Sequence, residues 1–113
     1  MAIESLDNIN KDLQSSTDAI RSISSLPKNI EQKAMDSAMK NPPKELVNVP
    51  PEKYGKYTNV ILADYSITHA KEISAEIGNP YDQKKFKDAI DSVKDVLGRG
   101  PVNWPDIVDA RKG

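Results

Sequence analysis

The chain of 113 residues has the length of about one domain, and its hydrophobic fraction of 37% allows only a modest core. Its 16 lysines and arginines nearly balance 17 aspartates and glutamates without a block of like charges, so no electrostatic signature of nucleic acid or anionic membrane binding is present. The absence of cysteine excludes disulfides, thiol catalysis, zinc fingers and iron–sulfur ligation.

The beginning of the sequence carries no export signal that we can recognise. Met-Ala-Ile-Glu-Ser lacks basic residues and an apolar run. The longest aliphatic stretch, residues 60–63, is far shorter than the ~20 residues that span a bilayer. We therefore expect a cytoplasmic protein without membrane association, although leaderless export or a place in a phage particle would leave no trace here.

The first predicted element is a long amphipathic helix over about residues 2–25. Its apolar residues fit a seven-residue repeat along one face: Leu6, Ile9, Leu13, Ile20 and Ile23. Serine and threonine at 15–17 and 22–25 weaken the helix propensity, so packing must hold this segment. Two interpretations stay open, because such a stripe faces either the core of its own bundle or a second chain. In the second case these residues bind a partner.

Pro27 interrupts the chain, and a short second helix is predicted from about residue 28 to Met39. The residues expected on its apolar side are Ile30, Ala34, Met35, Ala38 and Met39. Alanine allows close helix contacts, and methionine adapts to irregular surfaces. We favour a core role for this face, with a yielding binding surface as the alternative.

Proline pairs at 42–43 and 50–51 bracket the next segment. Each proline lacks an amide donor and biases the preceding residue toward extended geometry. We therefore predict a linker or an extended arm over residues 41–57, with 44–49 as a short strand or a polyproline-like strap. Tyr54 and Tyr57 alternate with lysines near its end. We interpret this loop as a docking strap for a protein, with base stacking in nucleic acid as the weaker alternative.

A helical hairpin is predicted over residues 58–97. The apolar block that begins at Val60 keeps helical spacing to Ile77, and Gly78 supplies a left-handed stop. The alternative is a strand over 57–64 followed by a helix from Ser66. In the second arm of the hairpin, Asn79 is the expected cap and Pro80 occupies the first turn. The apolar stripe of that arm comprises Phe86, Ala89, Ile90, Val93, Val96 and Leu97.

The helix is expected to end before Gly98, where the glycine- and proline-rich break over 98–101 begins. The tail over residues 98–113 starts with this break and carries Trp104, the only tryptophan. This side chain either packs into the core of the hairpin or forms an exposed anchor at an interface. We include it among the candidate partner-binding residues.

His69 is the only histidine, and Glu72 and Glu76 share its helical face. Carboxylates around an imidazole are the material of a metal or acid–base site. No second histidine and no His-Glu-x-x-His motif accompany them. We therefore interpret His69 as a surface residue and expect no catalytic residue, metal or cofactor.

Taken together, the patterns predict a single all-α domain that forms a small helical bundle. The predicted function is that of a noncatalytic interaction or assembly protein, such as a structural, adaptor or chaperone-like subunit, whose partner is another protein or a second copy. The alternative is a small regulator or inhibitor that binds nucleic acid or a nucleic-acid enzyme. It would act through the loop at 54–57 and the lysines Lys84, Lys85 and Lys87.

Overall fold

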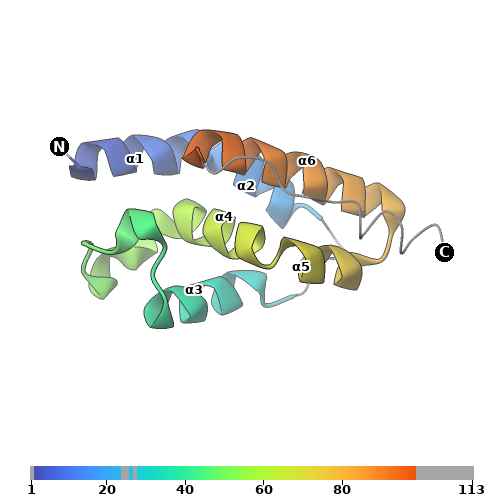
Figure 1. Ribbon diagram of the computed structural model, residues 1–113, viewed down its shortest axis with the longest axis horizontal. Coiled ribbons are helices and arrows are strands. Elements are labelled where there is room, and N and C mark those ends of the chain that lie inside the picture. Colours follow the sequence, from blue (N-terminus) through green and yellow to red (C-terminus); the bar gives the residue numbers. More distant parts are fainter. Residues whose placement is uncertain (1, 24–25, 27, 99–113) are drawn as a thin grey trace.

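The computed structural model describes residues 2–23, 26 and 28–98, and this part of the chain confirms the predicted all-α fold. The α-helices are α1 (Ala2–Asp12), α2 (Gln14–Arg21), α3 (Ile30–Lys40), α4 (Thr58–Thr68), α5 (Ala70–Ile77) and α6 (Pro80–Leu97), and the 3₁₀ helices are η1 (Lys44–Leu46) and η2 (Pro51–Tyr57). Figure 1 shows two layers, with α1, α2 and α6 in one and α3, α4 and α5 in the other. No described residue is in a strand, so the alternative strand over 57–64 is wrong.

The predicted long N-terminal helix is divided at Leu13 into α1 and α2. The backbone path stays nearly continuous, because the Leu13 amide donates to the Ile9 carbonyl at 3.0 Å and its own carbonyl accepts from the Thr17 amide at 2.9 Å. The Thr17 hydroxyl also lies 3.0 Å from that carbonyl. Such side-chain bonding to the preceding turn competes with regular helix geometry. Ser24 and Ser25, at the predicted end, lie outside the described residues.

Residues 41–57 do not form the predicted extended arm. Pro43 and Pro50 have extended backbone angles, and each immediately precedes a 3₁₀ helix. Pro51 then starts η2 at a position where a missing amide costs no hydrogen bond. Buried Leu46 and Tyr54 anchor the two 3₁₀ helices to the core, so burial and not local propensity determines the path of this segment.

The predicted helix over 58–77 is divided at His69. The backbone there departs from α geometry, with φ −115° and ψ 23°, although the His69 amide still donates to the Tyr65 carbonyl at 3.0 Å. The stop at Gly78 is confirmed, since its φ of 71° lies in the region that glycine tolerates. This turn reverses the chain, and α6 runs antiparallel to α4 and α5 (Figure 1).

The predicted signals at the two ends of α6 are confirmed. The Asn79 side chain accepts hydrogen bonds from the amides of Tyr81 at 2.9 Å and Asp82 at 3.2 Å. These bonds satisfy two of the amides that a helix start leaves free. Pro80 occupies the first turn, and left-handed Gly98 follows the last residue of the helix.

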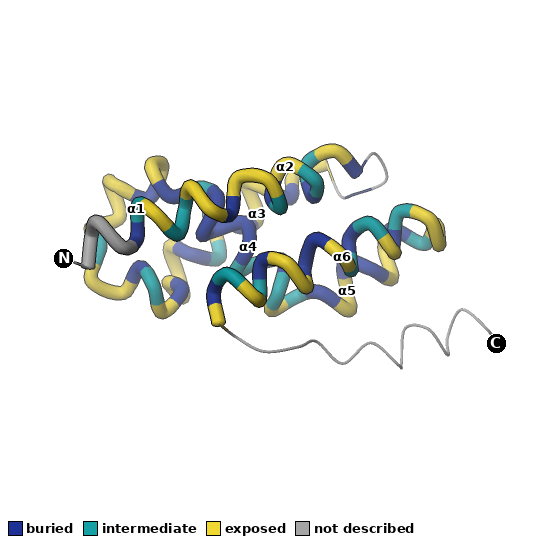
Figure 2. The backbone as a smooth tube through the Cα atoms, turned by 90° about the horizontal axis from the view of Figure 1, so that it is seen from above, coloured by how far each residue is buried: buried dark blue, intermediate teal, exposed yellow. Residues whose placement is uncertain are grey.

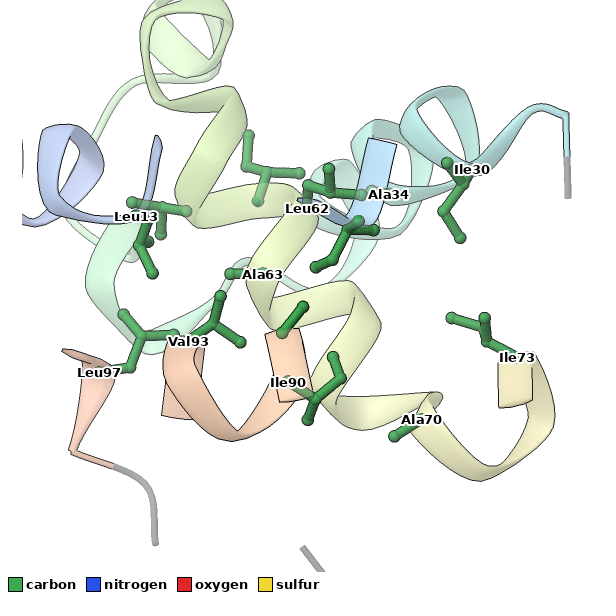
Figure 3. Close-up of a cluster of buried hydrophobic side chains, with 14 of the residues drawn as sticks. Leu13, Ile30, Ala34, Leu62, Ala63, Ala70, Ile73, Ile90, Val93 and Leu97 are labelled. Atoms are coloured by element: carbon green, nitrogen blue, oxygen red, sulfur yellow. The ribbon is translucent and has the colours of Figure 1, made fainter. Parts of the chain in front are cut away.

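Helix α4 lies at the centre of the bundle and contacts α1, α2, α3 and α6. Its buried residues lie on all sides of the helix: Asn59, Val60, Ile61, Leu62, Ala63 and Ser66. Figure 3 shows side chains from both layers meeting around Leu62 and Ala63, and Figure 2 shows the exposed positions along the outer faces of α1, α2 and α6. A helix that is apolar all round belongs in a core, which explains this position. Within the described residues, no helix has the length and apolar character needed to cross a membrane.

Candidate functional site

The N-terminal stripe lies in the core of its own chain. Leu6, Leu13, Ile20 and Ile23 are buried, and Ile9 packs against them half-buried. Of the two interpretations left open by the sequence, the intramolecular one describes these positions. A partner could reach this stripe only if α1 and α2 separated from the rest of the bundle.

The predicted docking strap is also turned inward. Tyr54 and Tyr57 are each only 3% exposed, so neither ring is available on the surface for a partner or a base. The Tyr57 hydroxyl donates to the Asp7 carboxylate at 2.7 Å, and Lys56 lies 3.6 Å from the other oxygen of Asp7. The hydrogen bond to Asp7, with burial and the carboxylate charge, raises the pKa of Tyr57. This loop therefore ties η2 to α1.

The lysines proposed for nucleic acid contact are interleaved with acidic residues. Lys84 lies 3.4 Å from Asp88, and Lys87 lies 3.4 Å from Asp91, each one helical turn away. Such pairs are typical of a solvated helix face. Trp104, the remaining candidate, lies outside the described residues.

Asn59 forms the centre of a buried polar network that the sequence did not reveal. Its amide nitrogen donates to the Asn10 carbonyl at 2.9 Å and to the Gln14 side chain at 3.0 Å. Its carbonyl oxygen accepts from Arg21 at 3.0 Å and lies 3.0 Å from the Thr17 hydroxyl. The one available signal in the sequence was a polar residue at the edge of the most apolar block. The network fixes the position of α1 and α2 against α4 and leaves no capacity for a ligand.

Exposed apolar side chains occur at the end of α3 and just after η1. Met39 is 59% exposed and Val47 is 61% exposed. The prediction that Met39 lies on the buried face of its helix is wrong. The buried positions Ile30, Ala34 and Ala38 are spaced by four residues, whereas Met35 and Met39 each follow one position later, about 100° around the helix.

A groove of about 150 Å³ lies between α3 and α4 beside Met35. We call it the Met35 groove, and its lining residues are Glu31, Gln32, Ala34, Met35, Thr58, Ile61 and Leu62. Met39 lies one turn beyond Met35 on the same face of α3, so exposed apolar surface continues from the groove. An adaptable methionine surface beside an apolar pocket is suited to receiving a side chain of another protein.

A second hollow, of about 280 Å³, lies between α3 and the junction of α4 with α5. We call it the His69 cleft, and its lining residues are Ile30, Lys33, Tyr65, His69, Glu72, Ile73 and Glu76. The rings of Tyr65 and His69 are stacked, with centroids 4.2 Å apart and planes inclined by 24°. The sequence had placed His69 and the two glutamates on one face, but could not show that Lys33 joins them from α3.

The side chains that line the His69 cleft can bind a charged or aromatic group, but they do not form a set of metal ligands. His69 Nδ1 lies 3.1 Å from the Tyr65 carbonyl oxygen. Burial, followed by the charges of Glu72 and Glu76, raises the pKa of Tyr65, so its hydroxyl stays protonated at neutral pH. Among the described residues, no group of three or more histidines and carboxylates is arranged to hold a metal ion.

Comparison with models of known protein families, with curated proteins and with solved structures finds no match for this chain. The Met35 groove and the His69 cleft are therefore the candidate functional sites in the described part of the chain.

Proposed function

We propose that the protein is a noncatalytic interaction or assembly protein and that it meets a partner protein at the Met35 groove and Met39. The observation that carries this proposal is the continuity between a groove with an apolar floor and a methionine side chain that is 59% exposed. Exposed apolar surface of this kind marks interaction sites when it adjoins a pocket.

The size of the groove limits what it receives. A dry cavity of about 150 Å³ holds a benzene-sized group in another protein. The floor of the Met35 groove contains Ile61 and Leu62, both buried. One apolar side chain of the partner therefore fills the groove, while Met39 adapts to the surface around it.

The remaining parts of the proposal follow from the sequence. One histidine and no cysteine leave little material for catalysis, so we assign no catalytic role. We place the protein in the cytoplasm. The partner is either a different protein or a second copy of this chain.

Site-specific photo-crosslinking tests the proposal on the full chain. A photoreactive amino acid at position 39 should give a discrete covalent adduct with one partner species in an extract of the source cells, or a covalent dimer of the purified protein. The matched control carries the same group at Tyr81, which is 74% exposed but lies in the first turn of α6. Adducts that are identical at both positions, or absent at position 39, would refute the proposal.

Light scattering separates the two kinds of partner. A mass that rises over a hundredfold range of concentration, and that returns to the monomer value in Met39→Glu, would identify a second copy as the partner. A constant monomer mass with a position-specific adduct from the extract would identify a different protein.

A further inference from the structure

Among the described residues, no positively charged side chain forms an ion pair with either glutamate of the His69 cleft. Glu72 and Glu76 lie one turn apart on α5 and are exposed, and like charges at this spacing repel one another. Neither carboxylate forms an ion pair with any residue in the described part of the chain. Lys33, across the cleft on α3, forms none either. The cleft thus carries two negative charges and one positive charge that are not neutralised by contact.

Aromatic surface lies in the same hollow as these charges. Tyr65 and His69 are half-buried, and their stacked rings form a rigid pair at the junction of α4 and α5. The rings and the two carboxylates all line one cleft of about 280 Å³. A group that fits must therefore have a positive charge and a flat apolar face.

We propose that the His69 cleft receives the arginine side chain of a partner protein. A guanidinium is planar, stacks on aromatic rings and forms paired hydrogen bonds with carboxylates. A lysine ammonium is compact and strongly hydrated, and it lacks the flat face that would use the rings. An anionic group would gain from Lys33 alone and would be repelled by two carboxylates. The inference rests on the proposed function, because the arginine belongs to a protein partner.

The His69 ring provides a direct readout, because it is the only histidine and its proton resonances stand alone in an NMR spectrum. The probe is the peptide acetyl-Gly-Arg-Gly-amide, titrated into the full chain at low salt. We expect saturable shifts of the His69 and Tyr65 ring protons that weaken as salt is added. The same peptide with citrulline, which keeps the shape and loses the charge, should give no saturable shift. Equal shifts with both peptides would overturn the proposal.

Charge variants give the sharper test, since their effects have opposite signs. Glu72→Gln and Glu76→Gln should each weaken binding of the arginine peptide by roughly two- to fivefold. Lys33→Gln should strengthen it by roughly twofold, because a like charge is removed. Glu52→Gln, at an exposed carboxylate on η2, is the matched control and should change nothing. Circular dichroism checks that each variant keeps its helical content.

Two results would overturn the proposal of an arginine site. An unchanged affinity in the Glu72→Gln, Glu76→Gln double variant would refute the arginine site. Tighter binding of acetyl-Gly-Glu-Gly-amide than of the arginine peptide, lost in Lys33→Gln, would show an anion site instead. Failure here leaves the crosslinking at position 39 unaffected, so this proposal and the proposed function fail separately.

Discussion

On the side of α4 that faces α1 and α2, the Asn59 side chain is enclosed and hydrogen-bonded to Asn10, Gln14 and Arg21. On the side that faces α3, the same helical layer leaves the Met35 groove and the His69 cleft open. The Asn59 amide is satisfied within the chain on the first side, whereas on the second side Lys33, Glu72 and Glu76 form no ion pair with any described residue and Met39 is exposed. The comparison teaches that side chains whose hydrogen bonds are made within the chain specify the fold. Side chains without such contacts mark the surface where a partner is to be sought.

The largest expected difference between the two sides concerns buried and exposed apolar residues. Leu13→Ala removes a side chain with no exposed surface and should lower the free energy of unfolding by about 2–5 kcal/mol. Met39→Ala, at an exposed position, should change it by less than about 0.5 kcal/mol. Urea denaturation measures both. Similar losses in the two variants would mean that Met39 is not a free surface residue.

The polar network should be nearly as sensitive as the apolar core. Asn59→Ala removes the hydrogen bonds of a buried amide to Arg21, Gln14 and the Asn10 carbonyl, so we expect a loss of about 2–3 kcal/mol in the free energy of unfolding. Asn48→Ala is the control, because Asn48 is exposed. An equally small effect of both substitutions would show that water readily replaces the network.

The link between η2 and α1 should appear in the pH dependence of stability. The pKa of Tyr57 is raised in the folded chain above the ordinary value of 10.0, chiefly by the hydrogen bond to Asp7. The stabilisation is therefore complete below pH 10 and is lost as the pH rises through the higher folded pKa. Tyr57→Phe should lower the thermal midpoint at neutral pH and flatten its decline above pH 10. Tyr81→Phe, at an exposed ring, should keep the wild-type profile.

The smallest expected effect has the opposite sign. The Ser66 hydroxyl is fully buried on α4 and has no hydrogen-bond partner among the described residues. Ser66→Ala removes an unsatisfied polar group and improves helix propensity, so it should raise the free energy of unfolding by about 1 kcal/mol. Ser92→Ala, at an exposed position on α6, isolates the helix-propensity part of this gain. Destabilisation by Ser66→Ala would reveal a partner for the hydroxyl, such as a bound water.

Sequence reasoning succeeded where the structural signal was local. Asn79, Pro80 and Gly98 defined α6 because caps and stops act within one helical turn. The path of residues 41–57 was not predictable in this way, because Leu46 and Tyr54 hold it by burial against distant helices. The division at His69 likewise has no local signature, since helical spacing continues across it.

The candidate site was predicted only in part, for a related reason. Spacing along one helix placed His69, Glu72 and Glu76 together, but Lys33 joins them from α3 through tertiary packing alone. Met39 was assigned to the wrong face because it directly follows buried Ala38 and therefore lies about 100° farther around the helix. Without the tertiary arrangement, an apolar residue that faces the core and one that faces solvent look the same, as Leu13 and Met39 show.

The central position of α4 also affects how the chain folds during its synthesis. During synthesis, α1, α2 and α3 emerge from the ribosome before α4, so their inward faces are then without the helix that all three pack against in the folded chain. A nascent chain at this stage has helices without a core and is vulnerable to aggregation and to proteolysis. The complete core therefore forms only after α4 and α6 have emerged, because both layers of the bundle pack against α4.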